Sequence, residues 1–372
     1  MMNNDQPIDL AQQNKQVSTL IDEDTKIVIS FDGGGIKGLM SVIIAAAIEK
    51  AAGVPLSKAC DLLIGTSIGG ITALLLATPD EEDANIPKFK ASSLAHYYRD
   101  FAKTVFSVPL SRAVKTLWGY DKSKYTSQKI KKVMEEHFKE TLLSQALTRA
   151  VVVGAEIERY SPMLLKSYEE PDFFMKDAAF ATSAAPTFFP VAKIKSISHD
   201  KNSSLAEGKN EDYYLIDGKI TGANNPALVG YVEICNIFNN IKDIKDKVIV
   251  ISIGTGKAHR TIHYDEVAEA GILTWIPLVF PLIGELANDI TDYQMDLLLK
   301  DIPITTPETL RRYWRLQPSI PEDLLMIDNF SEKKLTDLAN IAKNYVLEHK
   351  REIRTIGMLL SHRAQYLNKS KK

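Results

Sequence analysis

The hexapeptide GTSIGG, at residues 65–70, has the residue types and the spacing of a nucleophile turn. A short apolar run precedes it, and a helix-like apolar segment follows it. In a G-x-S-x-G arrangement, a sharp strand-to-helix turn lifts the serine above the sheet, and the flanking glycines avoid the collisions that Cβ atoms would cause. The motif therefore predicts Ser67 as a nucleophile, with Gly65 and Gly69 as the residues that permit the turn. The alternative is a tight glycine turn with an incidental serine.

A second glycine-rich segment, FDGGGIKG at Phe31–Gly38, satisfies the G-x-G-x-x-G pattern of dinucleotide-binding turns. A turn of that kind is followed, about twenty residues later, by an acidic residue that ends the second strand and holds a ribose hydroxyl. Here Gly53–Pro55 occupies that position, and Asp61 precedes the next strand instead of ending it. Nucleotide binding by this segment therefore lacks its second anchor and is kept only as an alternative.

The consecutive glycines of this segment have another use. Gly33, Gly34 and Gly35 stand before a helix-like run, so their backbone N–H groups can bind an oxyanion as readily as a phosphate. An anion site beside a nucleophile turn indicates acyl transfer. Lys37 either adds positive potential to this loop or is a solvated lysine on the first helical turn.

A serine nucleophile requires a base, and the segment YYLIDGK offers one. An apolar strand delivers Asp217 into a turn at Gly218, which places its side chain at the sheet edge where open α/β folds collect their active-site residues. Burial and a hydrogen bond to Ser67 would raise the basicity of this carboxylate above that of an ordinary aspartate. The alternatives are an Asp-Gly turn without a catalytic role, and a triad that uses one of the seven histidines, none of which lies in a recognisable motif.

Hydrophobic periodicity predicts the elements that position these residues. Two successive strand-turn-helix units, followed by further β-branched runs, indicate an α/β fold with a mainly parallel central sheet sandwiched by helices. We find no internal repeat, low-complexity block or linker, so we expect a polar tail at residues 1–24 and a single catalytic domain at residues 25–372 with a helical C-terminal part. The predicted strands are Lys26–Phe31, Leu62–Ile64, Ala150–Ile157, Asp212–Gly218 and Lys247–Gly254.

Composition excludes some classes of partner. A net charge of −2 over 372 residues provides no bulk attraction for nucleic acid or anionic lipid, so any partner has to be recognised locally. The two cysteines argue against a disulfide framework, and the polar N-terminus lacks the apolar core of a conventional signal peptide. We therefore expect a cytoplasmic or peripheral membrane protein, with export by another route as an alternative.

The longest apolar stretch, GILTWIPLVFPLIG at residues 271–284, is too short and too interrupted by proline to cross a bilayer. Its pattern favours a buried pair of helices. A wall that binds an acyl chain or contacts a membrane is the alternative.

In their order along the chain, these motifs resemble those of the patatin-like phospholipases. The resemblance extends over nearly the whole chain and implies a patatin-like three-layer fold with a nucleophile elbow. It implies a Ser/Asp dyad in place of a triad: Ser67 accepts the acyl group, Asp217 takes and returns the proton, and the three glycines bind the oxyanion. The motifs are DGGGIKG at Asp32–Gly38, GTSIGG at Gly65–Gly70, ATSAAPTFFP at Ala181–Pro190, DGKITGANNPAL at Asp217–Leu228 and ISIGTG at Ile251–Gly256.

One residue departs from the family pattern. Lys219 follows Asp217 and Gly218, where the family usually has Gly or Ala. A side chain at this position either narrows the site, attracts a phosphate head group or points into water.

The resemblance implies a lipid acyl hydrolase that cleaves carboxylic esters of membrane phospholipids or other lipids, without a metal or another cofactor, and that contacts the membrane peripherally. Two other functions stay open. One is nucleotide binding by the glycine-rich turn at residues 33–38. The other is a binding or storage protein on the same scaffold that is inactive until a protein or small-molecule activator arrives. The sequence predicts no particular oligomeric state.

Overall fold

A mixed eight-stranded sheet forms the centre of the protein, in the order β5-β6-β3-β2-β1-β7-β9, with β4 paired to β3. The computed structural model describes residues 21–105, 123–197, 211–258, 261–299, 311–325 and 331–369, so nearly all of the expected polar tail lies outside the described residues. Two further strands, β8 and β10, pair with each other. The strands are β1 (Lys26–Phe31), β2 (Leu62–Thr66), β3 (Arg149–Glu156), β4 (Ser161–Lys166), β5 (Ala192–Lys195), β6 (Asp212–Asp217), β7 (Val248–Ile253), β8 (Lys257–Ala258), β9 (Tyr313–Leu316) and β10 (Ser319–Ile320).

The direction of the strands agrees with the predicted fold class. β1 pairs in parallel with β2 and β7, β2 with β3, and β7 with β9. The strands β4, β5 and β6 are antiparallel to their neighbours, which the sequence did not indicate. The α/β fold with a mainly parallel sheet is therefore confirmed. Because β1 and β2 are parallel neighbours, the two glycine-rich segments that follow them meet at one edge of the sheet.

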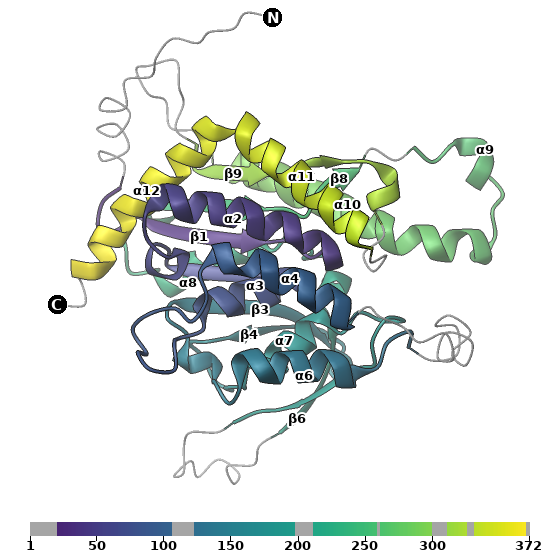
Figure 1. The fold of residues 1–372 in the computed structure, drawn as a ribbon, viewed down its shortest axis with the longest axis horizontal. Coiled ribbons are helices and arrows are strands. Elements are labelled where there is room, and N and C mark those ends of the chain that lie inside the picture. The colour runs from purple at the N-terminus through teal and green to yellow at the C-terminus, as the bar shows by residue number, and fades with distance from the viewer. Residues whose placement is uncertain are drawn as a thin grey trace, which may run out of the picture.

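Helices cover both faces of the sheet, which gives three layers (Figure 1). Alternate residues of β1 face opposite layers: Ile29 and Phe31 belong to one buried cluster and Val28 to the other. Side chains of α8 and α10 contribute to the second cluster, and the other long helices contribute to the first. The helices are α2 (Gly38–Ala52), α3 (Ile68–Ala77), α4 (Ala91–Val105), α6 (Ser127–Phe138), α7 (Met175–Ser183), α8 (Ala227–Ile237), α9 (Tyr264–Val267), α10 (Ile272–Leu298), α11 (Glu332–Glu348) and α12 (Lys350–Lys369).

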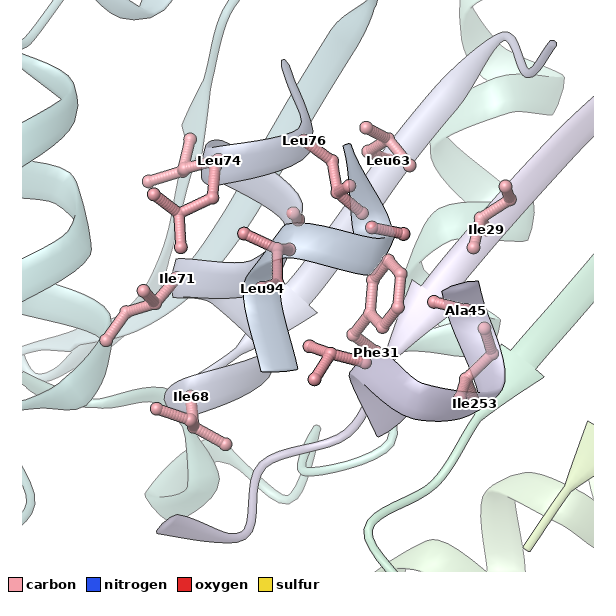
Figure 2. Close-up of a cluster of buried hydrophobic side chains, with 14 of the residues drawn as sticks. Ile29, Phe31, Ala45, Leu63, Ile68, Ile71, Leu74, Leu76, Leu94 and Ile253 are labelled. Carbon is pink, nitrogen blue, oxygen red and sulfur yellow. The ribbon is translucent and has the colours of Figure 1, made fainter. Parts of the chain in front are cut away.

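The larger cluster packs the first two strand-turn-helix units against each other. Figure 2 shows Phe31 at the end of β1 among side chains that include Leu63, Ile71 and Leu94. All four side chains are fully buried, so this cluster excludes water from below the edge where β1 and β2 end. A dense core at this place keeps the two glycine-rich segments in a constant relative position.

A buried ion pair joins the C-terminal helix α12 to the start of β2. The guanidinium of Arg363 on α12 donates to both oxygens of Asp61, at 2.6 and 2.9 Å, just before β2 begins. The backbone N–H of Ile27 in β1 also donates to Asp61. Removing one member of a buried pair leaves an uncompensated charge, which typically costs about 3–5 kcal/mol. Asp61 is therefore committed to structure, and it is not available to hold a ribose.

Candidate active site

The nucleophile turn has the strained geometry that its motif predicts. Ser67 has φ 56° and ψ −127°, between the end of β2 and the start of α3. A Cβ added to Gly65 would lie 2.2 Å from the carbonyl oxygen of Gly69, and one added to Gly69 would lie 2.2 Å from that of Phe31. Both contacts involve backbone, which cannot move aside. The two glycines are therefore required by the close approach of strand and helix, as expected from the sequence.

A threonine from another element supports this turn. The backbone N–H of Ser67 donates to Oγ1 of Thr182 at 2.9 Å, and that hydroxyl donates to the carbonyl oxygen of Val153 at 2.6 Å. Thr182 lies on α7, within the ATSAAPTFFP segment, to which the sequence analysis assigned no individual role. The segment thus helps to hold the strained serine. Thr182 is 115 residues from Ser67 in the sequence, so no local pattern could predict this contact.

Asp217 ends β6 beside the nucleophile. Its Oδ1 accepts a hydrogen bond of 2.8 Å from the N–H of Lys219, and its own N–H donates to the carbonyl oxygen of Ala184. Burial raises the pKa of Asp217 from its ordinary value of 3.8 to about 6, against the opposing effects of a hydrogen bond with the Ser67 side chain and of the Lys219 backbone and charge. The structure therefore brings together a serine hydroxyl and a desolvated carboxylate.

Gly218 is required where β6 leaves the sheet. A Cβ at this position would lie 2.3 Å from the carbonyl oxygen of Val153, so any side chain would push β6 away from β3. Asp217 is paired with Gly154 of β3, and the residue before Gly154 is paired with Thr66 of β2. This register explains how an antiparallel strand still delivers its carboxylate to the edge where Ser67 stands.

The glycine-rich loop offers two of the three donors that the sequence predicts. The N–H of Gly33 donates to the carbonyl oxygen of Asn224 at 3.0 Å, so the expectation that Gly33 supplies a free donor is wrong. Within the described part of the chain, no acceptor lies within hydrogen-bond distance of the N–H groups of Gly34 and Gly35. A Cβ at Gly34 would lie 2.3 Å from Oγ1 of Thr255. Only a residue without a side chain fits there.

The carbonyl of Gly33 is held as firmly as its N–H. It accepts hydrogen bonds from Oγ1 of Thr255 at 2.9 Å and from Nδ2 of Asn224 at 3.4 Å. Both partners come from segments far along the chain, and both belong to motifs that the sequence analysis quoted without assigning them a role. Their contacts fix the orientation of the peptide that precedes Gly34, and preorganised donors need no reorganisation when charge develops.

Asp32 anchors the start of the same loop. Its carboxylate is fully buried and forms two hydrogen bonds with the guanidinium of Arg315, at 2.6 and 2.9 Å. Arg315 lies on β9 and also donates to Oγ of Ser252. Arg315 was not among the site residues predicted from the sequence. A charged residue inside the otherwise apolar strand YWRL was the available signal, because a buried cation needs a partner.

Two lysines lie near this edge of the sheet. Lys37 is only 4% exposed, so its interpretation as a solvated lysine is wrong. Burial lowers the pKa of Lys37, and the charges of Glu285 and Asp32 oppose that effect. Lys219 is half-buried and lies against α10: a Cβ at Gly284 would come within 2.2 Å of its Cε. Its side chain therefore extends along a helix.

Gly38 lets α2 begin beside the nucleophile helix. A Cβ at Gly38 would lie 2.6 Å from the ring of Tyr98 and 3.0 Å from the side chain of Ile68. Ile68 is the first residue of α3, so the loop and the nucleophile helix are in close contact at this point. The third glycine of the G-x-G-x-x-G pattern is thus explained by packing.

Among the described histidines, His96, His137 and His349 give no support to the triad alternative. Nδ1 of His137 and Nδ1 of His349 each lie within hydrogen-bond distance of a carbonyl oxygen one turn earlier in the same helix. His96 is exposed and forms an ion pair with Asp100. His199 and His259 lie outside the described residues.

The apolar stretch at residues 271–284 forms the first half of one helix, α10. The expected buried pair of helices is therefore wrong, because a proline removes one hydrogen bond and bends a helix without having to end it. The prediction that this stretch is buried was also wrong, because Ile272 and Leu273 are 72% and 75% exposed. In the part of the chain that the structure describes, no helix has the length and apolar content needed to span a membrane.

Comparison with known proteins agrees with this geometry. A sequence model described as patatin-like phospholipase matches residues 29–231. Patatin-like protein 1 of Arabidopsis thaliana is 28% identical over 349 residues, which is 85% of this chain and 80% of that protein. Patatin-like protein 2 of the same plant is 30% identical over 303 residues, which is 73% of this chain and 72% of that protein.

Among solved structures, VipD from Legionella pneumophila is similar with a TM-score of 0.36 and 13% sequence identity, covering 91% of this chain and 67% of that one. The matched family region contains both glycine-rich segments and the whole of β6. It also covers more than half of the chain. This protein belongs to the patatin-like phospholipase family, a family of carboxylic ester hydrolases.

Proposed function

We propose that this protein is a lipid acyl hydrolase that cleaves carboxylic esters of phospholipids or other membrane lipids through an acyl-enzyme on Ser67. The observation that carries the proposal is the proximity of the strained Ser67 to the buried Asp217, which is close enough for the serine side chain to lower the pKa of the carboxylate against the effect of burial. A carboxylate with a pKa of about 6 is a stronger base than an ordinary aspartate and is still ionised at neutral pH.

In the first half of the proposed reaction, Oγ of Ser67 attacks the carbonyl carbon of the ester while Asp217 takes the hydroxyl proton. The negative charge that develops on the carbonyl oxygen is stabilised by the free N–H groups of Gly34 and Gly35. When the tetrahedral intermediate collapses, the C–O bond to the alcohol breaks, and Asp217 returns the proton to the leaving oxygen. The acyl group then remains on Ser67.

In the second half, a water molecule attacks the acyl-enzyme. Asp217 takes a proton from this water, and the same N–H groups stabilise the second tetrahedral intermediate. Oγ of Ser67 leaves and receives the proton from Asp217, which regenerates the dyad. The products are an alcohol and a fatty acid, and no step requires a cofactor.

We also propose that residues 25–372 act as one catalytic domain. Strands from both halves of the chain lie in the same sheet, since β1 pairs with β7 and β7 with β9. The C-terminal helices α11 and α12 pack against α2, which directly follows the glycine-rich loop. A separate C-terminal unit would leave the outer surface of α2 uncovered.

The nucleotide-binding alternative has lost its support. Asp61 is bound to Arg363, and the N–H of Gly33 is bound to Asn224, so neither group is available to a ribose or a phosphate. The activator-dependent alternative differs from the proposal in one respect. It requires the serine to be unreactive in the isolated protein.

Labelling with a fluorophosphonate tests the proposal. We expect the purified protein, with nothing added, to form one covalent adduct, in which Oγ of Ser67 displaces fluoride from phosphorus. Mass spectrometry of the digested protein should find the probe on the peptide that contains Ser67. Heat-denatured protein serves as the control and should not react. An adduct on another serine, or none on folded protein, would contradict the proposal, and labelling that needs a partner would favour the activator-dependent alternative.

The pH dependence of hydrolysis follows from the pKa of Asp217. Protonated Asp217 cannot accept the proton of Ser67, so kcat/KM for a soluble p-nitrophenyl ester should fall about tenfold for each pH unit below 6. Above pH 6 the carboxylate is ionised, and the rate should reach a plateau. Initial rates between pH 4.5 and pH 8.5 measure this profile. A rate that stays at its plateau down to pH 4.5 would mean that Asp217 is not the desolvated base.

A further inference from the structure

The outer surface of α10 carries a row of exposed apolar side chains. These residues follow one another at intervals of three and four, so they form one stripe along the helix. They are between 52% and 63% exposed, which is unusual for large apolar side chains on five successive positions of one helix face. We call them the α10 stripe: Ile283, Leu286, Ile290, Tyr293 and Leu297.

The opposite surface of α10 is buried against the protein. Gly284, Asn288, Thr291, Met295 and Leu299 repeat with the same spacing and are all buried. Because successive residues of a helix are separated by about 100°, these residues and the α10 stripe lie on nearly opposite sides of the helix. The stripe therefore points away from the body of the protein, and its exposure is a property of the folded helix.

Further apolar side chains are exposed at the beginning of α10 and on α9. Ile272 and Leu273 are 72% and 75% exposed, and Tyr264 on α9 is 79% exposed. In Figure 1, α9 and the start of α10 extend away from the three layers at one side of the molecule. Elsewhere in the described residues, no other helix carries a comparable row of exposed large apolar side chains, and α11 has Leu347 alone. A row of exposed apolar side chains such as the α10 stripe marks an interaction surface.

The inner surface of α10 contacts the candidate active site. Oδ1 of Asn288 accepts a hydrogen bond of 3.1 Å from Nδ2 of Asn224, whose backbone carbonyl binds the N–H of Gly33. One turn earlier, Gly284 lies against the side chain of Lys219. The α10 stripe is thus separated from the loop of the active site by one helix, about 10 Å across. Whatever covers the stripe lies next to the site.

The charges of residues 264–298 indicate which kind of lipid surface this part of the protein can approach. From residue 264 to residue 298 the chain has no lysine or arginine. Of its acidic residues, Asp289 is paired with Lys257, Asp292 accepts a hydrogen bond from Tyr313, and the charge of Glu285 acts on the buried Lys37. The remaining four, Asp265, Glu266, Glu269 and Asp296, are exposed and leave the surface of this region negative. A surface of anionic lipids would repel it, whereas phosphatidylcholine presents its quaternary ammonium group outermost. The acidic residues are Asp265, Glu266, Glu269, Glu285, Asp289, Asp292 and Asp296.

We propose that the α10 stripe, together with Ile272 and Leu273, docks the protein on a zwitterionic lipid surface and so brings the active site to its substrate. This inference rests on the proposed lipid acyl hydrolase function, because it supplies the lipid substrate. The apolar side chains enter the boundary between head groups and acyl chains, and the acidic side chains at the edge of the stripe face the choline groups. Binding of this type grows with the apolar area that leaves water.

The experiment measures flotation of the protein with vesicles of diether phosphatidylcholine, which lack a cleavable ester and so separate binding from turnover. Wild-type protein should float with these vesicles and, at low ionic strength, less with vesicles of diether phosphatidylglycerol. The double variant Leu286→Asp/Ile290→Asp places two charges in the stripe and should bind phosphatidylcholine vesicles at least about tenfold more weakly, since each buried Leu or Ile contributes about 1.5–3 kcal/mol. Leu347→Asp, at a 62% exposed position on α11, is the matched control and should bind as wild type does.

Turnover of a soluble p-nitrophenyl ester distinguishes this inference from the proposed function. The double variant should retain the wild-type kcat/KM on that ester, because both positions are exposed and neither contacts the site. If the wild-type protein did not hydrolyse the soluble ester, the proposed hydrolase function would be refuted, whether or not the protein bound vesicles. The docking proposal is overturned if the double variant floats as wild type does, or if wild type prefers the anionic vesicles. It is also overturned if light scattering shows a wild-type dimer that the double variant breaks while wild type ignores vesicles.

Discussion

Replacing Ser67 by Ala is expected to lower kcat/KM for a soluble ester by at least about 10⁴-fold, to the rate of the uncatalysed reaction plus that of any residual oxyanion binding. The loss is this large because the proposed mechanism has no second nucleophile. The free N–H groups of Gly34 and Gly35 remain in the variant, but they have no covalent intermediate to stabilise. Steady-state kinetics with a p-nitrophenyl ester measure the effect.

A second substitution at the same position separates chemistry from folding. Ser67 has φ 56°, a conformation that costs a residue with a side chain about 1–3 kcal/mol and costs glycine much less. Ser67→Gly should therefore be as inactive as Ser67→Ala but about 1 kcal/mol more stable in urea unfolding, after the greater freedom of glycine in the unfolded chain is taken into account. Hydrolysis within tenfold of wild type in either variant would exclude Ser67 as the nucleophile.

Replacing Asp217 by Asn is expected to lower kcat/KM by about 10³- to 10⁴-fold, because an amide cannot accept the proton of Ser67. Asparagine has the same shape and keeps an oxygen that can accept the 2.8 Å hydrogen bond from the N–H of Lys219. The turn at the end of β6 should thus persist. Asp177→Asn is the matched control, since burial also raises the pKa of Asp177 on α7. That control variant should hydrolyse the ester as wild type does.

Asp217→Asn should also make the protein more stable at alkaline pH. Folding raises the pKa of Asp217 from 3.8 to about 6, so the folded state holds this proton more tightly than the unfolded chain does. The resulting stabilisation is present below pH 3.8 and is lost as the pH rises through 6, a difference of about 3 kcal/mol for a shift of about two units. Asparagine never ionises and avoids this cost.

Urea unfolding at two pH values measures this effect. At pH 8 the free energy of unfolding of Asp217→Asn should exceed that of wild type by about 1–3 kcal/mol, and this advantage should be about 2 kcal/mol smaller at pH 4.5. A variant that is inactive and less stable at pH 8 would mean that Asp217 is a structural turn residue. A variant with wild-type activity would remove it from the proposed mechanism.

Features that depend on neighbouring residues could be predicted from the sequence. The turn around Ser67 is partly built within five residues, because a Cβ at Gly65 would meet the backbone of Gly69, as a sharp strand-to-helix turn requires. The contact that excludes a side chain at Gly69 comes instead from the backbone of Phe31 in β1. The α/β class followed in the same way from short apolar strands that alternate with helices. Asp217 could be proposed because a strand end and a glycine stand next to it in the chain.

The groups that these residues contact depend on how distant segments of the chain pack together. Gly33 and Gly34 are indistinguishable in the sequence, yet the carbonyl of Asn224 occupies the N–H of the first and leaves that of the second free. Asp32 pairs with Arg315, 283 residues away, and Asp61 pairs with Arg363, 302 residues away. No local pattern encodes such partners, because they are selected by packing between elements.

The exposure of α10 could not be predicted from the local sequence either. Its composition indicated burial, because long apolar runs in globular proteins usually lie in the core. Its actual place depends on which face packs against the sheet, and that face is defined by Asn288, Met295 and other residues beyond the apolar run. The apolar side chains are exposed as a result. A run of residue types determines that a helix forms, whereas the neighbours of that helix determine which of its sides meets water.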